Sequence, residues 1–367
     1  MNRTVAALEN VSLALGSFSL RDIGLALGPG EILAILGPNG AGKSVTLETI
    51  AGFHRPCAGR IFIGGRDVTG LPPERRGVGL VFQNYGLFPH LTVAANVAFS
   101  LGARGRSARG PRGAEVAEAL TRFGIAHLSD RRPLDLSPGE KQRTALARAL
   151  ISEPGLFLFD EPFAALDAQT REGLREELGI FLRESAVPAI FVTHDQTDAS
   201  VLADRVAIMQ NGAIVQAGPV ADVFRAPASR FVADFLGIEN RLAARVVGWA
   251  GAYLRVAVGE HVLHVQGDLS ATPARDIFLC IRGEDVVLSH SDPAIPEAKA
   301  EGAPINRLRM RVVRVIGFGA LCKVLLDGGF LLTACLLRRS VRELGLMPGR
   351  DAVVEIAPDS IHLLAVR

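Results

Sequence analysis

Long apolar runs are missing from this chain of 367 residues. No stretch approaches the run of about 18 apolar residues that a membrane-spanning helix needs. Near the amino terminus, Glu9, Asn10 and Ser12 interrupt what would be the apolar region of a secretory signal. The sequence therefore predicts a soluble chain, whose attachment to any membrane depends on partner proteins.

An excess of one charge is also missing. The 40 Lys and Arg residues nearly balance the 38 Asp and Glu residues, and the net charge of +2 gives no electrostatic reason to expect nucleic-acid binding. The four cysteines, Cys57, Cys280, Cys322 and Cys335, have no paired metal-binding spacing and suit a reducing compartment. At about 150 residues per domain, the length predicts two to three domains.

What the chain does contain is a glycine-rich loop between a strand pattern, 32–36, and a helix pattern, 45–51. The loop reads Gly37, Pro38, Asn39, Gly40, Ala41, Gly42, Lys43 and Ser44. Glycines let backbone N–H groups turn toward phosphates, Lys43 can reach the β and γ phosphates, and Ser44 can bind Mg²⁺. A chance glycine-rich turn is the alternative, but the flanking strand and helix favour a nucleoside triphosphate site.

Two acidic residues follow a second buried strand. The run 156–159 is apolar at every position, as expected of a parallel strand covered on both faces. Asp160 can hold Mg²⁺ through its water shell, and Glu161 can orient and deprotonate an attacking water. The alternative is a carboxylate pair that caps a helix. The phosphate loop upstream favours the catalytic interpretation.

Two further polar residues end strand patterns. Gln83 follows the pattern 78–82, where its amide can reach Mg²⁺ or the attacking water. His194 follows the pattern 189–193 and can donate a hydrogen bond to a γ-phosphate. Each is a weak signal alone, because a single polar residue at a strand end is more often structural.

A third segment opens the helical pattern 144–150. It reads Leu136, Ser137, Pro138, Gly139, Glu140, Lys141, Gln142 and Arg143. Ser137 and Gly139 at a helix start can form an outward-facing anion site. In isolation, the same residues are better explained as an N-cap with a proline at the first helical position.

Taken in order, these motifs resemble the ATPase subunits of ATP-binding-cassette (ABC) transporters over residues 5–236. The resemblance implies an α/β P-loop nucleotide-binding domain that binds ATP and Mg²⁺. The implied nucleotide contacts are Gly37, Pro38, Asn39, Gly40, Ala41, Gly42, Lys43, Ser44, Val45 and Leu15. The implied metal ligands are Ser44, Gln83 and Asp160. The implied catalytic residues are Glu161 as the base, Gln83, and His194 as the γ-phosphate sensor.

In that family two nucleotide-binding domains face each other head to tail. The resemblance therefore implies a homodimer, in which Ser137, Gly139 and Glu140 of one chain complete the ATP site of the other. Asp167 would lie at the same seam. Pro138 departs from the family, because glycine is usual there and proline removes a backbone N–H. Slower hydrolysis or weaker ATP-driven dimerisation is the expected effect.

The adenine site departs from the family as well. The aromatic residue that stacks on adenine is expected near Leu15, and a leucine can pack on the base without stacking on it. Phe18 is the alternative residue for this role. We therefore expect this departure to affect the selectivity of the site for the base of the nucleotide.

Changes in residue pattern along the chain predict the order of domains. Residues 1–236 form the predicted nucleotide-binding domain, with a helical subdomain at about 88–155. From residue 237 onward, short β-branched runs alternate with glycine turns, which predicts a C-terminal all-β, barrel-like domain over 237–367.

A repeated sequence pattern divides that C-terminal domain. The pattern RLxxRVV begins at Arg241 and again at Arg307, which predicts two related β units, 237–290 and 305–367. The alternative is one type of strand used twice by chance.

The tail resembles the oligonucleotide-fold (TOBE-like) regulatory region of importer ATPases, and segment 336–349 is similar to its molybdate-binding type. Donors that could serve an oxyanion there are Asn306, Arg338, Arg339, Ser340 and Ser360. Asp359 places a carboxylate where such a site should have none. We therefore expect the tail to keep the fold and to bind molybdate weakly or not at all.

Together, the residues and the resemblance predict the ATPase subunit of a prokaryotic importer, most similar to the molybdate and tungstate type. Expected partners are a second copy, two transmembrane permease subunits that dock near residues 84–99, and, indirectly, an extracytoplasmic solute-binding protein. Nucleic acid is not an expected partner. The expected location is the cytoplasmic face of the inner membrane, as a peripheral subunit. The alternatives are an importer of sulfate, Fe³⁺ or polyamine, and a soluble ABC ATPase with no membrane partner.

Overall fold

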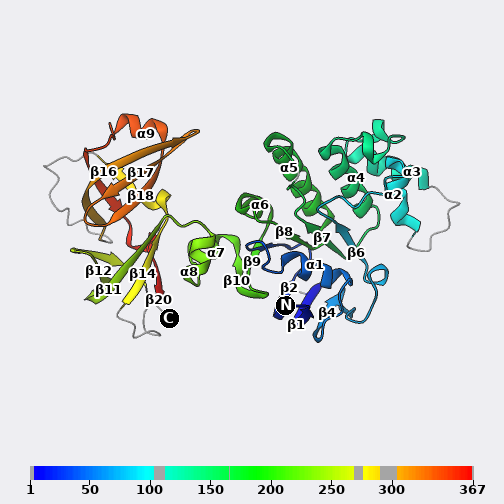
Figure 1. The fold of residues 1–367 in the computed structure, drawn as a ribbon, viewed down its shortest axis with the longest axis horizontal. Helices are drawn as coiled ribbons and strands as arrows, with labels where there is room; N and C mark the ends of the chain where they lie inside the picture. Colours follow the sequence, from blue (N-terminus) through cyan, green and yellow to red (C-terminus); the bar gives the residue numbers. More distant parts are fainter. Residues whose placement is uncertain (1–3, 103–111, 165, 268–275, 290–303, 366–367) are drawn as a thin grey trace. The chain divides into compact units, whose positions relative to one another are not determined.

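The structure is a computed structural model that describes residues 4–102, 112–164, 166–267, 276–289 and 304–365. The chain forms two compact units, Met1–Val223 and Phe224–Arg367, and each has its own hydrophobic core (Figure 1). The domain boundary expected between residues 236 and 237 lies further along the chain than this division and stays a prediction. None of the described helices is long and apolar enough to cross a membrane.

A six-stranded sheet, ordered β10-β9-β3-β8-β7-β6, lies at the centre of the first unit. Its strands are β3 (Ile32–Leu36), β6 (Val78–Val81), β7 (Leu156–Asp160), β8 (Ala189–Val192), β9 (Arg205–Gln210) and β10 (Ala213–Pro219). All neighbours are parallel except β9 and β10. Strands β3 and β8 are buried at every position, as expected for a sheet covered on both faces. The carboxyl ends of β3, β8, β7 and β6 therefore meet along one edge.

An antiparallel sheet, ordered β2-β1-β4-β5, shares its core with the central sheet. Its strands are β1 (Ala6–Leu15), β2 (Phe18–Leu27), β4 (Ala58–Ile63) and β5 (Arg66–Asp67). Helix α1 (Lys43–Ala51) contributes Leu47 and Ile50 to this core. The glycine-rich loop that precedes α1 is thus fixed at both ends by buried residues.

The remaining helices of the first unit follow the strands. They are α2 (Val93–Gly102), α3 (Arg112–Arg122), α4 (Pro138–Leu150), α5 (Ala168–Ser185), α6 (Gln196–Leu202) and α7 (Val220–Arg225), which ends just past the division. Short 3-10 turns lie at η1 (Pro73–Arg75), η2 (Ala126–Leu128) and η3 (Pro133–Asp135). Helices α2, α3 and α4 pack together as a helical layer, in the region where the sequence predicts a helical subdomain (Figure 1).

The second unit contains helix α8 and two five-stranded antiparallel sheets, ordered β13-β12-β11-β14-β20 and β15-β19-β16-β17-β18, around one core. The first sheet has β11 (Asn240–Ala250), β12 (Tyr253–Val258), β13 (His261–Val265), β14 (Asp276–Ile281) and β20 (His362–Ala365). The second has β15 (Val287–Ser289), β16 (Asn306–Phe318), β17 (Leu321–Asp327), β18 (Leu331–Leu337) and β19 (Asp351–Ile356). The helices are α8 (Arg230–Phe235), α9 (Arg338–Glu343), η4 (Gly283–Asp285) and η5 (Pro358–Ser360). The predicted fold class, α/β followed by all-β, is confirmed.

The two sheets of the second unit exchange strands. Strand β15 follows β14 in the chain but pairs with β19, and β20 follows β19 but pairs with β14. Each half therefore needs the other to complete its sheet. The stretch between the two predicted β units falls largely on residues 290–303, which lie outside the described residues.

Two buried asparagines tie the halves together at equivalent positions, immediately before the two copies of the RLxxRVV pattern. Asn240 donates to the carbonyl oxygens of Ile281 and Thr333 and accepts from the Thr333 N–H. Asn306 donates to the carbonyl oxygens of His264 and Ile356 and accepts from the His264 N–H. This equivalence supports two related β units, which stay a prediction.

Candidate active site

The glycine-rich loop leaves β3 and enters α1 through backbone angles that favour glycine. The φ angle is +78° at Gly40 and +104° at Gly42, the residue that caps α1. A Cβ atom on Gly42 would lie 2.6 Å from Cζ of Phe18, so the loop passes directly over that ring. Any larger residue at this position would force the loop away from the hairpin formed by β1 and β2.

The Lys43 ammonium folds back over its own loop. Its Nζ donates to the carbonyl oxygens of Gly37 at 2.9 Å and Pro38 at 3.1 Å. Burial lowers the pKa of Lys43, against the opposing effect of the carboxylates of Glu161 and Asp160. A buried cation of this kind gains from an added anion, which fits the predicted role of Lys43 toward phosphates. Val45 is partly buried and packs against the hydrophobic core, and its expected contact with the nucleotide stays a prediction.

Ser44 and Asp160 form the candidate Mg²⁺ site. The Ser44 hydroxyl donates to Asp160 Oδ1 at 2.9 Å, which joins α1 to the end of β7. Burial raises the pKa of Asp160, and the nearby carboxylates of Glu161 and Glu48 raise it further, although the Ser44 hydrogen bond lowers it. A carboxylate beside a hydroxyl is a hard oxygen donor set, which fits Mg²⁺. The described residues contain no group of three or more His, Cys, Asp and Glu that would bind a metal without further ligands.

Glu161 lies between the two polar residues expected to work with it. Its Oε2 is 3.5 Å from Nε2 of Gln83, and its Oε1 is 3.4 Å from Nδ1 of His194. The backbone of Glu161 has a φ of +46°, which is unusual for a residue with a side chain. Its N–H donates to the carbonyl oxygen of Val192 at 3.0 Å, so β8 holds this turn in place. The structure thus brings together three residues that follow β6, β7 and β8.

The segment at the start of α4 forms a complete capping box. Both the N–H and the hydroxyl of Ser137 donate to Glu140 Oε2, at 2.7 and 2.8 Å, and Ser137 Oγ accepts from the Glu140 N–H. The hydrogen bonds from Ser137 lower the pKa of Glu140.

The start of α5 lies against the capping box. A Cβ atom on Gly139 would lie 3.0 Å from Cγ2 of Thr170. Asp167, which is exposed, caps α5 by accepting from the Thr170 N–H, and this bond lowers the pKa of Asp167. Among the described residues, no hydrogen bond or ion pair joins Ser137 or Asp167 to loop 37–44. Within one chain, the predicted site residues therefore form two separate groups.

The hairpin between β1 and β2 holds both candidates for the adenine contact. Leu15 and Phe18 are paired across the turn, and both pack partly buried against the core. Phe18 is the residue whose ring lies beside Gly42 of the phosphate loop. The structure places the aromatic candidate next to the loop, and the roles of both residues stay predictions.

Sequence reasoning missed Arg148, which braces the segment after Gln83. Arg148 is buried on α4 and donates to the carbonyl oxygens of Gly86 at 2.6 Å and Tyr85 at 2.9 Å. Its guanidinium also lies 5.7 Å from the ring centre of Phe88. The signal in the sequence was a single arginine on an apolar helix face, which indicates a buried cation but names no partner.

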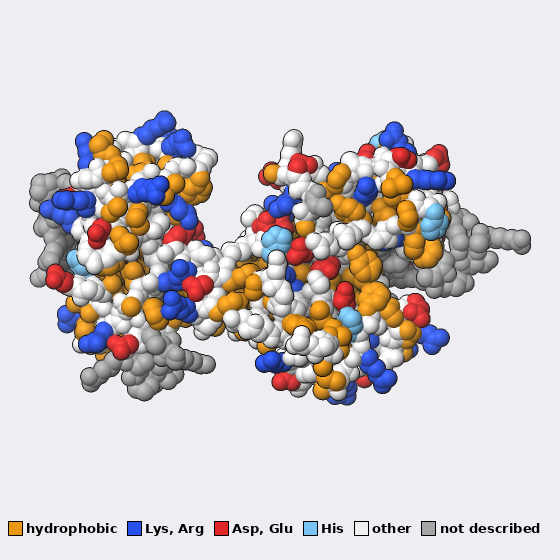
Figure 2. Space-filling view, in the orientation of Figure 1, with side chains coloured by type: hydrophobic (Ala, Val, Ile, Leu, Met, Phe, Trp, Pro, Cys, Tyr) orange, Lys and Arg blue, Asp and Glu red, His pale blue; other side chains and the backbone are white. Residues whose placement is uncertain are grey.

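Apolar side chains are exposed around the same segment. Phe53, Phe82 and Phe99 are 51%, 37% and 54% exposed, and the rings of Phe53 and Phe82 are 6.0 Å apart. Figure 2 shows hydrophobic side chains reaching the surface among mixed Lys, Arg, Asp and Glu side chains. An exposed aromatic cluster of this kind is typical of a protein contact surface.

The candidate oxyanion donors of the tail are mostly engaged elsewhere. Asn306 uses its side chain on the backbone of His264 and Ile356. The Ser360 hydroxyl donates to the carbonyl oxygen of Ala357, and the exposed Arg339 pairs with Glu343 at 2.6 Å. Ser340 and Arg338 lie on α9, and Asp359 lies on η5. Among the described residues, no hydrogen bond or ion pair joins these donors into one cluster.

Comparisons with known proteins identify the family. The ABC transporter family model matches residues 20–164, and the TOBE domain model matches residues 303–363. The molybdate/tungstate import ATP-binding protein WtpC of Pyrococcus horikoshii is 41% identical over 357 residues, which are 97% of this chain and 99% of that protein. The sulfate/thiosulfate import ATP-binding protein CysA 2 of Chromobacterium violaceum is 42% identical over 347 residues, 93% of this chain and 90% of that protein.

Other relatives and a solved structure agree. Proteins named for the import of spermidine/putrescine or of Fe(3+) ions are 42% identical over shorter stretches. The dimeric post-hydrolysis state of the ATP-binding cassette MJ0796 bound to ADP and Pi has a TM-score of 0.54 and 29% identity, and the match covers 59% of this chain and 98% of that chain. The order of the motifs, their meeting at one sheet edge and these similarities have one explanation: the chain belongs to the ABC transporter family, as an ATP-hydrolysing subunit that carries a TOBE domain.

Proposed function

We propose that this chain powers the import of molybdate or tungstate. The observation that carries the proposal is similarity along nearly the whole chain, at 41% identity, to an import ATP-binding protein named for these two anions. The similarity includes the C-terminal unit, which differs from the nucleotide-binding unit in fold and function. Sulfate, Fe³⁺ and polyamine remain the alternative solutes, because proteins named for them are similar at comparable identity.

The chemistry of ATP hydrolysis is assigned to residues at the sheet edge. On binding ATP, the Lys43 ammonium exchanges the carbonyl oxygens of Gly37 and Pro38 for phosphate oxygens. Ser44 and Asp160 would hold Mg²⁺, with Gln83 as a further ligand; the ion, when bound, neutralises charge on the phosphates. These groups fix the γ-phosphate in place for attack.

Glu161 then acts as the general base. Its carboxylate accepts the proton of the attacking water, and its contacts with Gln83 and His194 orient it. The His194 side chain is 58% exposed and is therefore free to donate to the γ-phosphate on its open side. The positive φ of Glu161 is a strained backbone conformation, and the hydrogen bond from its N–H to the carbonyl oxygen of Val192 holds it in place.

We infer that the active form is a head-to-tail homodimer. Ser137, Gly139 and Glu140 of one chain would complete the ATP site formed by loop 37–44 of the other, with Asp167 at the seam. Two observations support this: in the described part of one chain no hydrogen bond or ion pair joins the two groups of site residues, and the similar solved cassette is dimeric. A single chain then holds only half of each site.

The partners of the dimer are proposed to be two transmembrane permease subunits and, indirectly, an extracytoplasmic solute-binding protein. The exposed aromatic residues around segment 84–99 suit a docking surface for a permease helix, and Arg148 links that segment to α4. The subunit would then lie at the cytoplasmic face of the inner membrane. Closure of the dimer would move the docking surface and so switch the permease.

Uptake in the source cell tests this proposal. Deleting the gene should abolish uptake of radiolabelled molybdate and tungstate at low external concentration. A wild-type copy should restore uptake, and a Glu161→Gln copy should not. Loss of sulfate, Fe³⁺ or polyamine uptake instead would reassign the solute. Normal uptake of all of these would favour a soluble ABC ATPase.

A further inference from the structure

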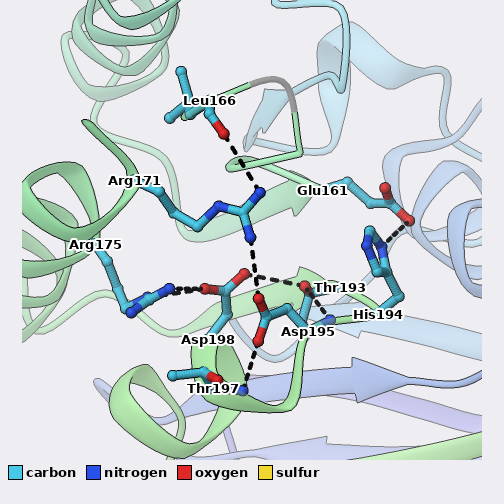
Figure 3. Close-up of polar contacts among 9 residues, drawn as sticks. All are labelled: Glu161, Leu166, Arg171, Arg175, Thr193, His194, Asp195, Thr197 and Asp198. Carbon is cyan, nitrogen blue, oxygen red and sulfur yellow. Dashed lines mark hydrogen bonds and ion pairs between the residues drawn. The ribbon is translucent and has the colours of Figure 1, made fainter. Parts of the chain in front are cut away.

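Arg171 on α5 joins two loops that flank the active site. Its Nη1 donates to Asp195 Oδ2 at 3.1 Å, and its Nη2 donates to the carbonyl oxygen of Leu166 at 3.5 Å (Figure 3). Asp195 follows His194 directly, and Leu166 precedes Asp167 directly. One side chain therefore connects the loop of the γ-phosphate sensor to the loop expected at the dimer seam.

The loop that carries His194 is also held by hydrogen bonds that do not involve Arg171. The Asp195 N–H donates to Thr193 Oγ1 at 3.0 Å, and Asp195 Oδ1 accepts from the Thr197 N–H at 2.7 Å, which caps α6. The Thr193 hydroxyl donates to Asp198, which is held by Arg175. Because these bonds make a stiff turn, a force applied to Asp195 reaches the neighbouring His194 backbone.

The side chain of His194 is held only weakly by its own contacts. Among the described residues its only hydrogen bond or ion pair is with Glu161, at 3.4 Å, and more than half of its surface is exposed. The position of His194 relative to Glu161 therefore depends on the backbone that carries it. Arg171 is the side chain that links this backbone to the turn that follows Glu161.

We propose that Arg171 is a positioning residue for ATP hydrolysis: it holds the His194 loop and the Leu166–Asp167 segment in one fixed relation. The sensor of one ATP site and the seam segment that reaches the other site then move together. The proposal rests on the homodimer proposed above. It adds a residue outside the phosphate loop and the sheet edge.

Arg171 is poorly placed to serve stability alone. Its Nε is buried and has no hydrogen-bond partner among the described residues, which costs free energy in the folded state. Arg175, one turn later, makes contrasting contacts: its Nε and Nη2 lie 2.8 and 2.7 Å from the buried Asp198. Arg175 thus stabilises the packing of α5 on α6, whereas Arg171 reaches beyond it to both loops.

Substitution of Arg171 in the full-length chain tests the proposal. Arg171→Met should lower kcat about tenfold, less than the ~10²-fold cost of a 1 Å misplacement, while the KM for ATP changes less than about twofold. Lysine keeps the charge that pairs with Asp195 but cannot reach both partners at once, so Arg171→Lys should stay below about half of the wild-type kcat. Arg183→Met is the matched control, because Arg183 lies on the same helix and, among the described residues, pairs with exposed Asp204 alone, at 3.6 Å. The kcat of this variant should equal that of the wild type.

A second variant keeps the test valid if Arg171→Met fails to fold. Asp195→Asn retains an N-cap acceptor for α6 but loses the charge that binds Arg171, so it should lower kcat by a similar factor at an unchanged Tm. An unchanged kcat in either variant, or a loss that appears in KM instead, would overturn the proposal. Such a failure leaves the proposed function intact as long as wild-type protein hydrolyses ATP and Glu161→Gln does not.

Discussion

Replacing Glu161 by glutamine separates ATP binding from hydrolysis. The two contacts of the Glu161 carboxylate, to Gln83 Nε2 at 3.5 Å and His194 Nδ1 at 3.4 Å, are both long. An amide of the same shape should therefore change the free energy of unfolding by less than about 1 kcal/mol. ATP binding should persist, because Lys43, Ser44 and Asp160 remain.

Hydrolysis should respond very differently. A positioned general base contributes at least ~10²-fold, so Glu161→Gln should raise the activation free energy by about 2.7 kcal/mol or more. Phosphate release at saturating MgATP measures the rate, and calorimetry with ATP measures binding. Lys43→Ala is the control, since it should weaken binding itself. A Glu161→Gln protein that hydrolyses ATP at the wild-type rate would refute the assignment of the base.

Three further predictions use the same assays. Glu140→Gln keeps an acceptor for Ser137 but removes a negative charge from the segment expected to face phosphate, so ATP-driven dimerisation should strengthen about threefold; weaker dimerisation would contradict this. Phe18→Ala should weaken ATP binding about three- to tenfold. Replacing Leu15, which pairs with Phe18 in the hairpin, by alanine should weaken ATP binding less. Equal effects of the two substitutions would rule out stacking of Phe18 on the base. Calorimetric titration of the full chain with molybdate should show no micromolar binding, because Asn306 is already bonded to backbone; tight binding would show an intact regulatory site.

The site residues at the sheet edge were predictable because each belongs to a short motif at the end of a buried strand. Parallel strands bring their carboxyl ends together, so the motifs containing Ser44, Asp160 and Glu161 had to meet once β3 and β7 were recognised. The general position of each residue therefore followed from local pattern. The long hydrogen bonds around Glu161 and its positive φ did not, since they depend on the turn held by Val192.

The long-range braces were not predictable in the same way. Arg148 binds backbone carbonyl oxygens 62 and 63 residues away in sequence, and every residue has such a carbonyl. Arg171 pairs with Asp195, 24 residues away, and the sequence does not single out this carboxylate among the other acidic residues. The exchange of β15 and β20 between sheets also lies outside local pattern, because alternation shows which face of a strand is buried but not which neighbour it pairs with. The sequence shows that Asn240 and Asn306 each precede a copy of the repeated pattern. Their hydrogen bonds to the opposite half of the unit, at Thr333 and His264, appear only in the fold.

The central claim is that two chains build each ATP site, and the most direct test is the molar mass of the Glu161→Gln protein in solution. Light scattering should give one chain of 39.0 kDa without nucleotide and about twice that mass with MgATP. Adding Ser137→Arg, which places a bulky side chain at the seam, should keep the protein monomeric in MgATP. A Glu161→Gln protein that binds ATP and stays at the mass of one chain would contradict the account.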